Sequence, residues 1–158
     1  MSPFTPLRVH SHGSLLAGVA SPEALCERAA ALGYAALGLT DRDNLYLAIR
    51  FLNAAKGAGL VPVIGAEVSA RADRTRVLLI PFDRRGWASL CAVLTARHLD
   101  GEFDLVRCVG EHHAGLHVVV ESPGLATALI AVGIPPAVGA SDEVARGLAR
   151  PRGRGGRA

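Results

Sequence analysis

The chain has 158 residues, half of them hydrophobic and a fifth charged, which predicts one globular domain and excludes a disordered protein. Its formal net charge is +3, but residues 146–158 contain five arginines and no acid, so residues 1–145 carry −2. A body of that charge is not a basic nucleic-acid-binding surface, and we expect it not to bind DNA directly.

The sequence also lacks the patterns of membrane and secreted proteins. No apolar run approaches the roughly 20 residues that a membrane-spanning helix needs. Residues 1–7 have no basic region followed by an apolar stretch, so no secretory signal is predicted. Three widely spaced cysteines indicate reduced thiols. We therefore expect a cytoplasmic protein without a membrane partner.

Short apolar runs, typical of buried strands, alternate with helical stretches along the chain. The first strand is predicted at 7–10. The first helix follows Ser21-Pro22-Glu23, an N-cap with proline at the first helical position, and ends at Gly33. The later elements are strand 35–40, helix 45–58, strands 61–68 and 77–81, helix 84–96, strand 117–121, helix 123–131 and strand 136–138. Strands separated by helices predict a parallel sheet, which is either doubly wound or most of a barrel.

From Arg146 the alternating pattern gives way to an Arg/Gly-rich run. We interpret residues 1–145 as the domain and residues 146–158 as a disordered tail. The alternative is a tail that binds RNA. The disordered tail is favoured because no aromatic residue accompanies the arginines.

Polar residues stand at the carboxyl ends of three predicted strands, where α/β folds place their sites. His10, Asp41 and Glu67 are candidate metal ligands, because imidazole and carboxylate suit zinc or manganese. The structural alternative is a histidine hydrogen-bonded in a loop, an aspartate that caps the helix at 45 and a surface glutamate. Spacing alone favours the structural alternative.

The remaining histidines give a weaker signal. His98 is interpreted as following a helix, and His112 and His113 as part of a polar loop. Loop histidines are usually solvated, so we do not predict a second metal site from them.

Four segments, taken in order, resemble motifs of the polymerase and histidinol phosphatase (PHP) domain. Residues 8–18 resemble its opening motif, typically His-x-His-Ser-x-x-Ser-Leu-Leu-Asp-Gly, and Thr40-Asp41-Arg42-Asp43-Asn44 resembles Thr-Asp-His-x-Asn. Gly65-Ala66-Glu67 matches a third motif, Gly-x-Glu. Residues 77–91 are similar to a stretch of the bacterial DNA polymerase III alpha subunit. The resemblance covers roughly residues 7–140 and indicates the N-terminal part of that subunit or of its error-prone relative.

Several motif positions depart from the family. Residues of other types replace the family's histidines and one aspartate at Arg8, Ala17, Arg42 and Arg76. The retained positions are His10, Asp41 and Glu67. Arginine has no lone pair to give a metal ion and stays protonated, so it cannot replace a ligand.

The resemblance implies an α/β fold, an incomplete PHP-type (β/α)7 barrel with parallel strands, truncated before the barrel closes. Intact members hold a multinuclear metal centre for phosphoester hydrolysis or proofreading. The replacements imply a vestigial site without catalytic residues or a cofactor. The alternative is an active metal-dependent phosphoesterase that binds zinc or manganese through His10, Asp41, Glu67 and a later histidine.

The resemblance also bears on partners. The chain lacks a polymerase active site, so its implied role in DNA replication or repair synthesis is structural or partner-docking. The expected partner is the remainder of a polymerase alpha subunit or another replication or repair subunit. The resemblance leaves open whether this chain is an enzyme: the family comprises DNA-directed DNA polymerases and metal-dependent phosphoesterases, and this chain alone is expected to be inactive.

Overall fold

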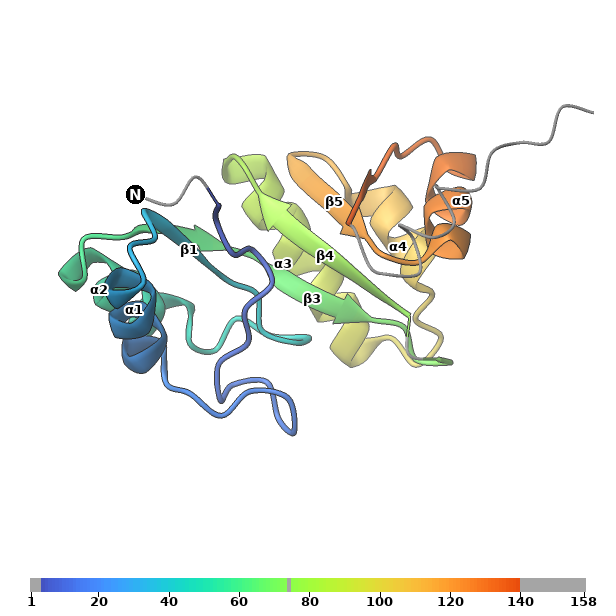
Figure 1. Ribbon diagram of the computed structural model, residues 1–158. Helices are drawn as coiled ribbons and strands as arrows, with labels where there is room; N and C mark the ends of the chain where they lie inside the picture. The colour runs from blue at the N-terminus through green and yellow to red at the C-terminus, as the bar shows by residue number, and fades with distance from the viewer. Residues whose placement is uncertain (1–3, 74, 140–158) are drawn as a thin grey trace, which may run out of the picture.

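The computed structural model describes residues 4–73 and 75–139, in which helices alternate with short strands (Figure 1). The helices are α1 (Pro22–Ala31), α2 (Ala48–Gly57), α3 (Arg84–Leu99), α4 (Leu105–His112) and α5 (Pro123–Ala131). The strands are β1 (Ala36–Leu39), β2 (Val61–Ile64), β3 (Ala66–Ser69), β4 (Arg76–Pro81), β5 (Leu116–Val120) and β6 (Ala137–Val138). The predicted tail at 146–158 and the end of the predicted domain at 145 lie outside the described residues.

The strands form two sheets that the chain connects directly. β1 pairs in parallel with β2, and the second sheet has the order β3-β4-β5-β6. The predicted strand 61–68 is split at Gly65 into β2 and β3, which belong to different sheets. Beyond β1, an isolated parallel bridge pairs Arg42 with Glu67, and the Glu67 amide donates to the Asp41 carbonyl at 3.1 Å. This contact brings the end of the first sheet against the first strand of the second.

The prediction that the strands are parallel throughout was wrong. β1–β2 and β5–β6 are parallel, but β3–β4 and β4–β5 are antiparallel. Only six residues separate β3 from β4, fewer than a parallel crossover requires, so these strands form a hairpin. Between β4 and β5 the chain contains two helices, α3 and α4, where one was predicted.

The helix that was not predicted from the sequence is α4. Asp104 caps it by accepting a hydrogen bond from the Arg107 amide at 2.7 Å, and Leu105, Cys108 and Val109 form its buried face. The interpretation of His112 and His113 as loop residues was therefore wrong, because His112 ends α4 and His113 is its C-cap. The other predicted helices are present. α2 begins three residues later than predicted and α3 extends to Leu99.

Residues 7–10, predicted as a strand, lie beside β1 without forming a full ladder. Gly38 donates to the Pro6 carbonyl at 2.7 Å, and Thr40 donates to the Val9 carbonyl at 2.9 Å. A Cβ atom at Gly38 would lie 2.6 Å from the Leu7 carbonyl oxygen, so glycine permits this close approach. In Figure 1 this segment crosses between the two sheets.

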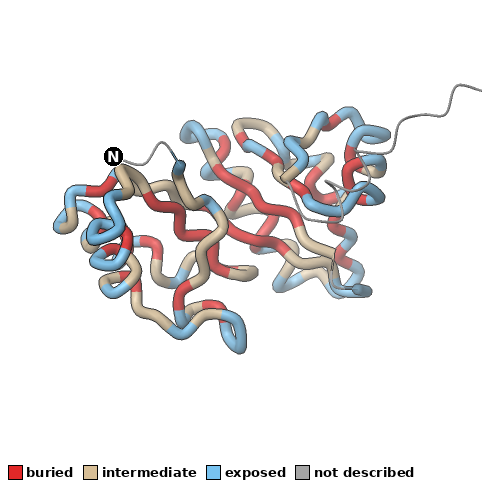
Figure 2. Tube along the Cα trace, in the orientation of Figure 1, coloured by how far each residue is buried: buried red, intermediate tan, exposed pale blue. Residues whose placement is uncertain are grey.

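Two hydrophobic cores support this arrangement. The smaller joins α1, α2 and β1 around Phe51, and the larger joins β3, β4 and β5 to α3, α4 and α5. Figure 2 shows the buried strands at the centre of the molecule. In β3, Ala66 and Val68 belong to the larger core, so Glu67 between them lies on the opposite face of the sheet. In the part of the chain that is described, no helix has the length and apolar character to cross a membrane.

Candidate functional site

A buried glutamate is the centre of the candidate site. Glu67 is 1% exposed and lies in the middle of β3, on the face of the sheet that the N-terminal segment covers. Leaving a carboxylate uncompensated in such a place is costly, so a buried acid requires charged or hydrogen-bonding partners.

Three arginines and one histidine supply these partners. Arg8 Nε lies 3.2 Å from Glu67 Oε1, and His10 Nε2 lies 3.2 Å from Oε2. Arg42 Nε and Arg76 Nη1 lie 3.6 and 3.7 Å from Oε2. The structure therefore brings five of the six predicted site residues together.

The local structure explains why these residues converge. Arg8 and His10 are two positions apart in an extended segment, so their side chains point to the same side. Arg42 occupies the bridge opposite Glu67. In the β3–β4 register Glu67 pairs with Leu78, which places Arg76 diagonally across the hairpin on the same face.

The surrounding charges control the ionisation of Glu67. Burial is the largest single effect and would raise its pKa, but the contact with His10 and the charges of His10, Arg8 and Arg76 together outweigh burial. The pKa of Glu67 is therefore lower than its ordinary value of 4.5. Glu67 is ionised at neutral pH, and its charge stabilises the folded state.

The contacts are ionic rather than well-formed hydrogen bonds. Arg8 Nε, His10 Nε2, Arg42 Nε and Glu67 Oε2 are all buried, and none of them meets hydrogen-bond geometry with another described residue. Their separations of 3.2 to 3.7 Å exceed the 2.7–2.9 Å that is typical of charge-assisted hydrogen bonds. The carboxylate is shared among several cations instead of forming one bidentate pair.

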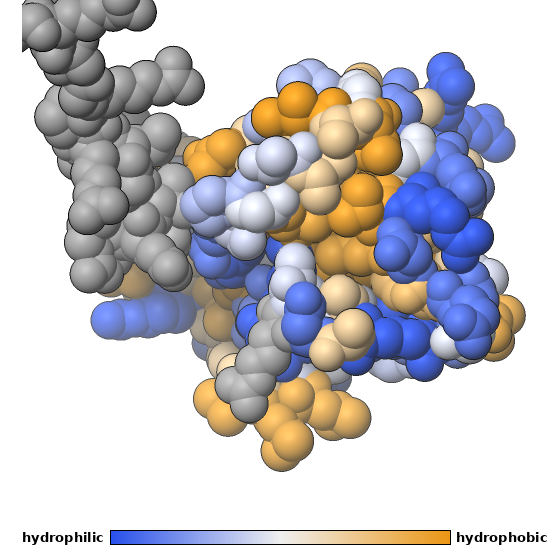
Figure 3. All heavy atoms as spheres, turned by 90° about the vertical axis from the view of Figure 1, so that its right-hand side faces the viewer, coloured by the Kyte–Doolittle hydropathy of each residue, from blue (hydrophilic) through white to orange (hydrophobic). Residues whose placement is uncertain are grey.

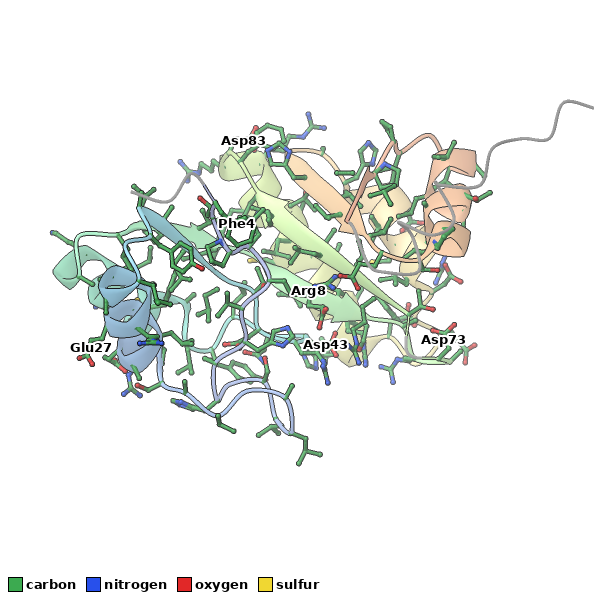
Figure 4. All side chains as sticks on the ribbon, in the orientation of Figure 1. Phe4, Arg8, Glu27, Asp43, Asp73 and Asp83 are labelled. Atoms are coloured by element: carbon green, nitrogen blue, oxygen red, sulfur yellow. The ribbon has the colours of Figure 1, made fainter. Side chains whose placement is uncertain are left out.

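A second acid, which sequence reasoning missed, joins the cluster. Glu121 follows β5 directly, and its carboxylate contacts Arg8 Nη1. The available signal was an acid immediately after a buried strand, but the resemblance did not assign a role to this position. Arg8 therefore links the N-terminal segment to both β3 and the end of β5, and Figure 4 shows it lying over the β3–β4 hairpin.

Asp41, the sixth predicted site residue, does not contact the arginines. Its carboxylate accepts hydrogen bonds from the Ser11 amide at 2.7 Å, the Ser11 hydroxyl at 2.5 Å and the Ser14 hydroxyl at 2.7 Å. Asp41 is 2% exposed and is not the cap of a helix, because α2 begins at Ala48 without a side-chain cap. It binds the turn that follows residue 10 to the end of β1.

The neighbouring residues Asp43 and His98 contact each other instead of joining the Glu67 cluster. The Asp43 carboxylate accepts from the Ser69 amide at 2.8 Å and the Ser69 hydroxyl at 2.5 Å, and it lies 3.5 Å from Arg97 Nη2. His98, which lies inside α3 rather than after it, places Nε2 2.6 Å from the Asp43 carbonyl oxygen. These contacts fasten α3 to the loop after β1.

The arrangement around Glu67 does not fit a divalent metal ion. Only His10 and Glu67 present metal-donor atoms to each other, because Asp41 is turned toward the serine hydroxyls. Ala17 lies exposed in the turn after residue 11 and has no donor atom. In residues 4–73 and 75–139, no three His, Cys, Asp or Glu side chains are arranged to hold a metal ion. Guanidinium groups occupy the remaining space around the carboxylate.

Comparison with known proteins identifies a matching family and two similar polymerases. A family model described as the PHP domain matches residues 6–134. The chain is 35% identical over 105 residues to the DNA polymerase III subunit alpha of Buchnera aphidicola, which covers 63% of this chain and 9% of that protein. It is 40% identical over 107 residues to the error-prone DNA polymerase of Mycobacterium bovis, which covers 62% of this chain and 10% of that protein.

Solved structures share the fold at lower identity. A protein from Bifidobacterium adolescentis, assigned as a metal-dependent phosphoesterase, aligns with a TM-score of 0.55 and 15% identity over 84% of this chain and 76% of that one. An amidohydrolase from Chromobacterium violaceum, described with bound sulfate and no metal, aligns with a TM-score of 0.55 and 19% identity over 85% of this chain and 75% of that one. At these identities the likeness concerns the fold alone.

Proposed function

The chain belongs to the PHP domain family, and we propose that it is a degenerate member with a structural role in a DNA polymerase III alpha-like protein. The chain spans about a tenth of the length of the polymerases it matches, and we propose that their polymerase activity resides in sequence beyond the matched part. We propose further that its two sheets form part of a PHP-type (β/α)7 barrel.

The observation that carries this proposal is the set of three guanidinium groups around Glu67. Arg8, Arg42 and Arg76 each approach the carboxylate that would otherwise be available to a metal ion. None of them has a lone pair to donate, and each adds a fixed positive charge that repels a cation. The vestigial site thus exchanges metal ions for ion pairs within the protein.

The ion pairs connect segments that are distant in the sequence. Through Glu67 and Glu121 they join the N-terminal segment, the loop after β1, the β3–β4 hairpin and the end of β5. We propose that this network fixes the two sheets relative to each other, a structural task that needs no catalysis.

Exposed apolar side chains support a docking role. The turn after residue 11 presents Leu15, Leu16 and Val19 to solvent. Hydrophobic side chains project at the bottom of the face shown in Figure 3. A second apolar area lies among hydrophilic side chains on the face in Figure 3 that carries α5. Ile130 near the end of α5 and Val138 in β6 are exposed. The last helix and the last strand of the second sheet therefore both offer apolar surface. We propose that further polymerase sequence or a replication or repair subunit packs on these surfaces.

Reversion of the motif tests the proposal. The variant carrying Arg8→His, Ala17→Asp, Arg42→His and Arg76→His should gain hydrolysis of a generic phosphodiester in the presence of Mn²⁺, whereas the unmodified chain should show none above background. A matched control changes three exposed arginines outside the cluster, Arg28, Arg50 and Arg85, to histidine and should remain inactive. Metal-dependent hydrolysis by the unmodified chain would contradict the proposal and favour the active phosphoesterase.

A further inference from the structure

We propose that the groove between α4 and α5 binds the chain's own arginine-rich segment, residues 146–158. This inference goes beyond the proposed structural role, which concerns the cluster around Glu67 on the opposite face of the second sheet. It rests on the shape and charge of the groove, on the composition of the segment and on the place where the described chain ends.

The groove is an open hollow with an apolar floor. α4 and α5 pack side by side (Figure 1), and a Cβ atom at Gly110 in α4 would lie 3.7 Å from Val132 Cγ2 at the end of α5. The apolar side chains of Val106, Ala128 and Val132 line the hollow, which has a volume of about 870 Å³. Ligand pockets of proteins have volumes of about 300–1,000 Å³, so the hollow can receive several side chains. Its exposed apolar atoms favour an occupant that also has apolar groups.

Acidic side chains surround this floor. Glu102, Asp104 and Glu111 line the groove and are exposed. Among the described residues that line the groove, Arg107 is the sole basic one, and its Nη2 lies 3.6 Å from Asp100 Oδ2. In the described part of the chain, the three lining acids have no basic side chain within 4.0 Å. The groove therefore presents negative charge that the described structure leaves unpaired.

The arginine-rich segment complements both features of the groove. Residues 146–158 contain five arginines and no acid, whereas residues 1–145 carry −2. The segment also contains Leu148, an apolar side chain for the floor of the groove. No aromatic residue accompanies the arginines, which favours an acidic protein surface over RNA as their ligand. A segment that lacks a fold of its own can become ordered on a preformed surface.

The described chain ends close enough to the groove for the segment to reach it. The Gly139 amide donates to the Val120 carbonyl at 2.7 Å, and a Cβ atom at Gly139 would lie 3.5 Å from Glu121 Cγ. α5 begins at Pro123 and has nine residues, which corresponds to a length of about 13 Å. The six residues 140–145 can span about 20 Å when extended. Such a short tether gives an effective concentration in the millimolar range, so weak exposed ion pairs suffice for binding.

The test measures the proximity of segment and groove in the full, untagged chain with a nitroxide label. The label is attached to Ala149→Cys in a chain whose partly exposed thiol is removed by Cys91→Ser. The other two cysteines, Cys26 and Cys108, are buried and remain. The reference is the same chain after chemical reduction of the label, which abolishes its effect on neighbouring NMR signals.

The label should broaden the amide NMR signals of Gly110 and Ala128, which line the groove. The signal of Gly57 in α2, which belongs to the other part of the fold, should keep its intensity. Raising the salt concentration should reduce the broadening, because salt screens attraction between exposed charges. Groove signals that are not broadened at low salt would overturn the proposal.

A charge reversal and a matched control locate the contact. In the labelled chain, Glu111→Lys should reduce the broadening at Gly110 about twofold or more, because it replaces an attraction by a repulsion. A lysine near the carboxyl end of α4 is compatible with the helix dipole. Glu27→Lys changes the net charge equally but reverses an exposed acid in α1, and it should leave the broadening unchanged. An equal effect of the two substitutions, or none of Glu111→Lys, contradicts the assignment.

Substitutions in the segment test the same contact without changing the groove. Arg146→Gln, Arg150→Gln and Arg152→Gln introduced together should reduce the broadening at Gly110 as Glu111→Lys does. This result decides if Glu111→Lys alters the circular dichroism spectrum. Unchanged broadening in the triple variant would show that the arginines do not hold the segment in the groove and would overturn the proposal.

Two further measurements identify other occupants and other ligands. When a labelled chain is mixed with an isotope-enriched chain that has no label, broadening in the enriched chain would show that a second copy supplies the segment. A short single-stranded RNA is then added to the labelled chain. If the RNA binds the segment and no groove signal was broadened before its addition, RNA is the ligand of the arginines. Either result would overturn binding of the segment within its own chain.

Discussion

Arg76 and Glu67 face each other diagonally across the β3–β4 hairpin, with Arg76 Nη1 3.7 Å from Glu67 Oε2. The pairing follows from the register, which places Glu67 opposite Leu78 and Arg76 two residues further along the same face. Because the hairpin is antiparallel, an arginine at the start of β4 reaches the carboxylate in the middle of β3. Arg76 thus supplies a counter-charge to the buried carboxylate of Glu67.

Glu67→Gln should destabilise the fold. The substitution leaves Arg8, Arg42 and Arg76 without their shared counter-charge while preserving the shape of the side chain. Removing one partner of a buried ionic group is strongly destabilising, but the arginines are about one-third exposed and partly screened, so we expect a loss of about 2 kcal/mol. Urea unfolding followed by circular dichroism measures the change.

The matched control for that experiment is Glu23→Gln. Glu23 forms an exposed ion pair with Arg50, with 2.6 Å between Glu23 Oε1 and Arg50 Nε. Solvent screens such a pair, so its loss should have a much smaller effect than the loss of Glu67. Equal destabilisation by the two substitutions would show that the buried cluster makes no special contribution.

The stability of the chain should depend on pH through Glu67. Its pKa is lower in the folded protein than in the unfolded chain, so the folded state binds the proton less readily. The stabilisation is therefore fully present above the ordinary glutamate pKa of 4.5 and is lost as the pH falls through the lower folded value. The difference in unfolding free energy between the unmodified chain and Glu67→Gln should shrink on acidification below about pH 4. A difference that stays constant over this range would contradict the assigned ionisation.

Gly38→Ala should separate the N-terminal segment from β1. The new methyl group would lie 2.6 Å from the Leu7 carbonyl oxygen, a contact that only a shift of the backbone can relieve. We expect a loss of about 2 kcal/mol, as in other overpacked sites, together with displaced NMR signals from Arg8 and His10. Gly57→Ala in α2, where the methyl group meets nothing within 4 Å, should be neutral or stabilising by up to about 1 kcal/mol. The prediction fails if Gly38→Ala behaves like this control.

The elements were predictable from the sequence where local signals were strong. Ser21 caps α1 by accepting from the Ala24 amide at 3.2 Å, and α5 has the predicted bounds. Strand direction was not predictable from periodicity, because a buried antiparallel hairpin and a buried parallel strand both give continuous apolar runs. The direction of β3 and β4 follows instead from the connection between them, which is too short for a parallel crossover.

For the site, the motif positions identified the residues that converge, but not their partners. Residue spacing does not show that Asp41 turns to Ser11 and Ser14 while Glu67 turns to the arginines, because both acids are predicted at the carboxyl ends of strands. Glu121 was missed because it comes from a distant part of the chain and its contact with Arg8 depends on the pairing of β4 with β5. Such contacts are set by tertiary structure, which residue spacing does not encode.

The central claim, that ion pairs have replaced the metal centre, is tested most directly by the metal content of the unmodified, untagged chain. The protein is equilibrated with Mn²⁺, which carboxylate and imidazole bind but cysteine thiols disfavour, and is then freed of excess ion and measured by plasma mass spectrometry. We predict far less than one manganese ion per chain, and an increase in the variant with Arg8→His, Ala17→Asp, Arg42→His and Arg76→His. One or more tightly bound ions per unmodified chain, lost in Glu67→Gln, would contradict the account.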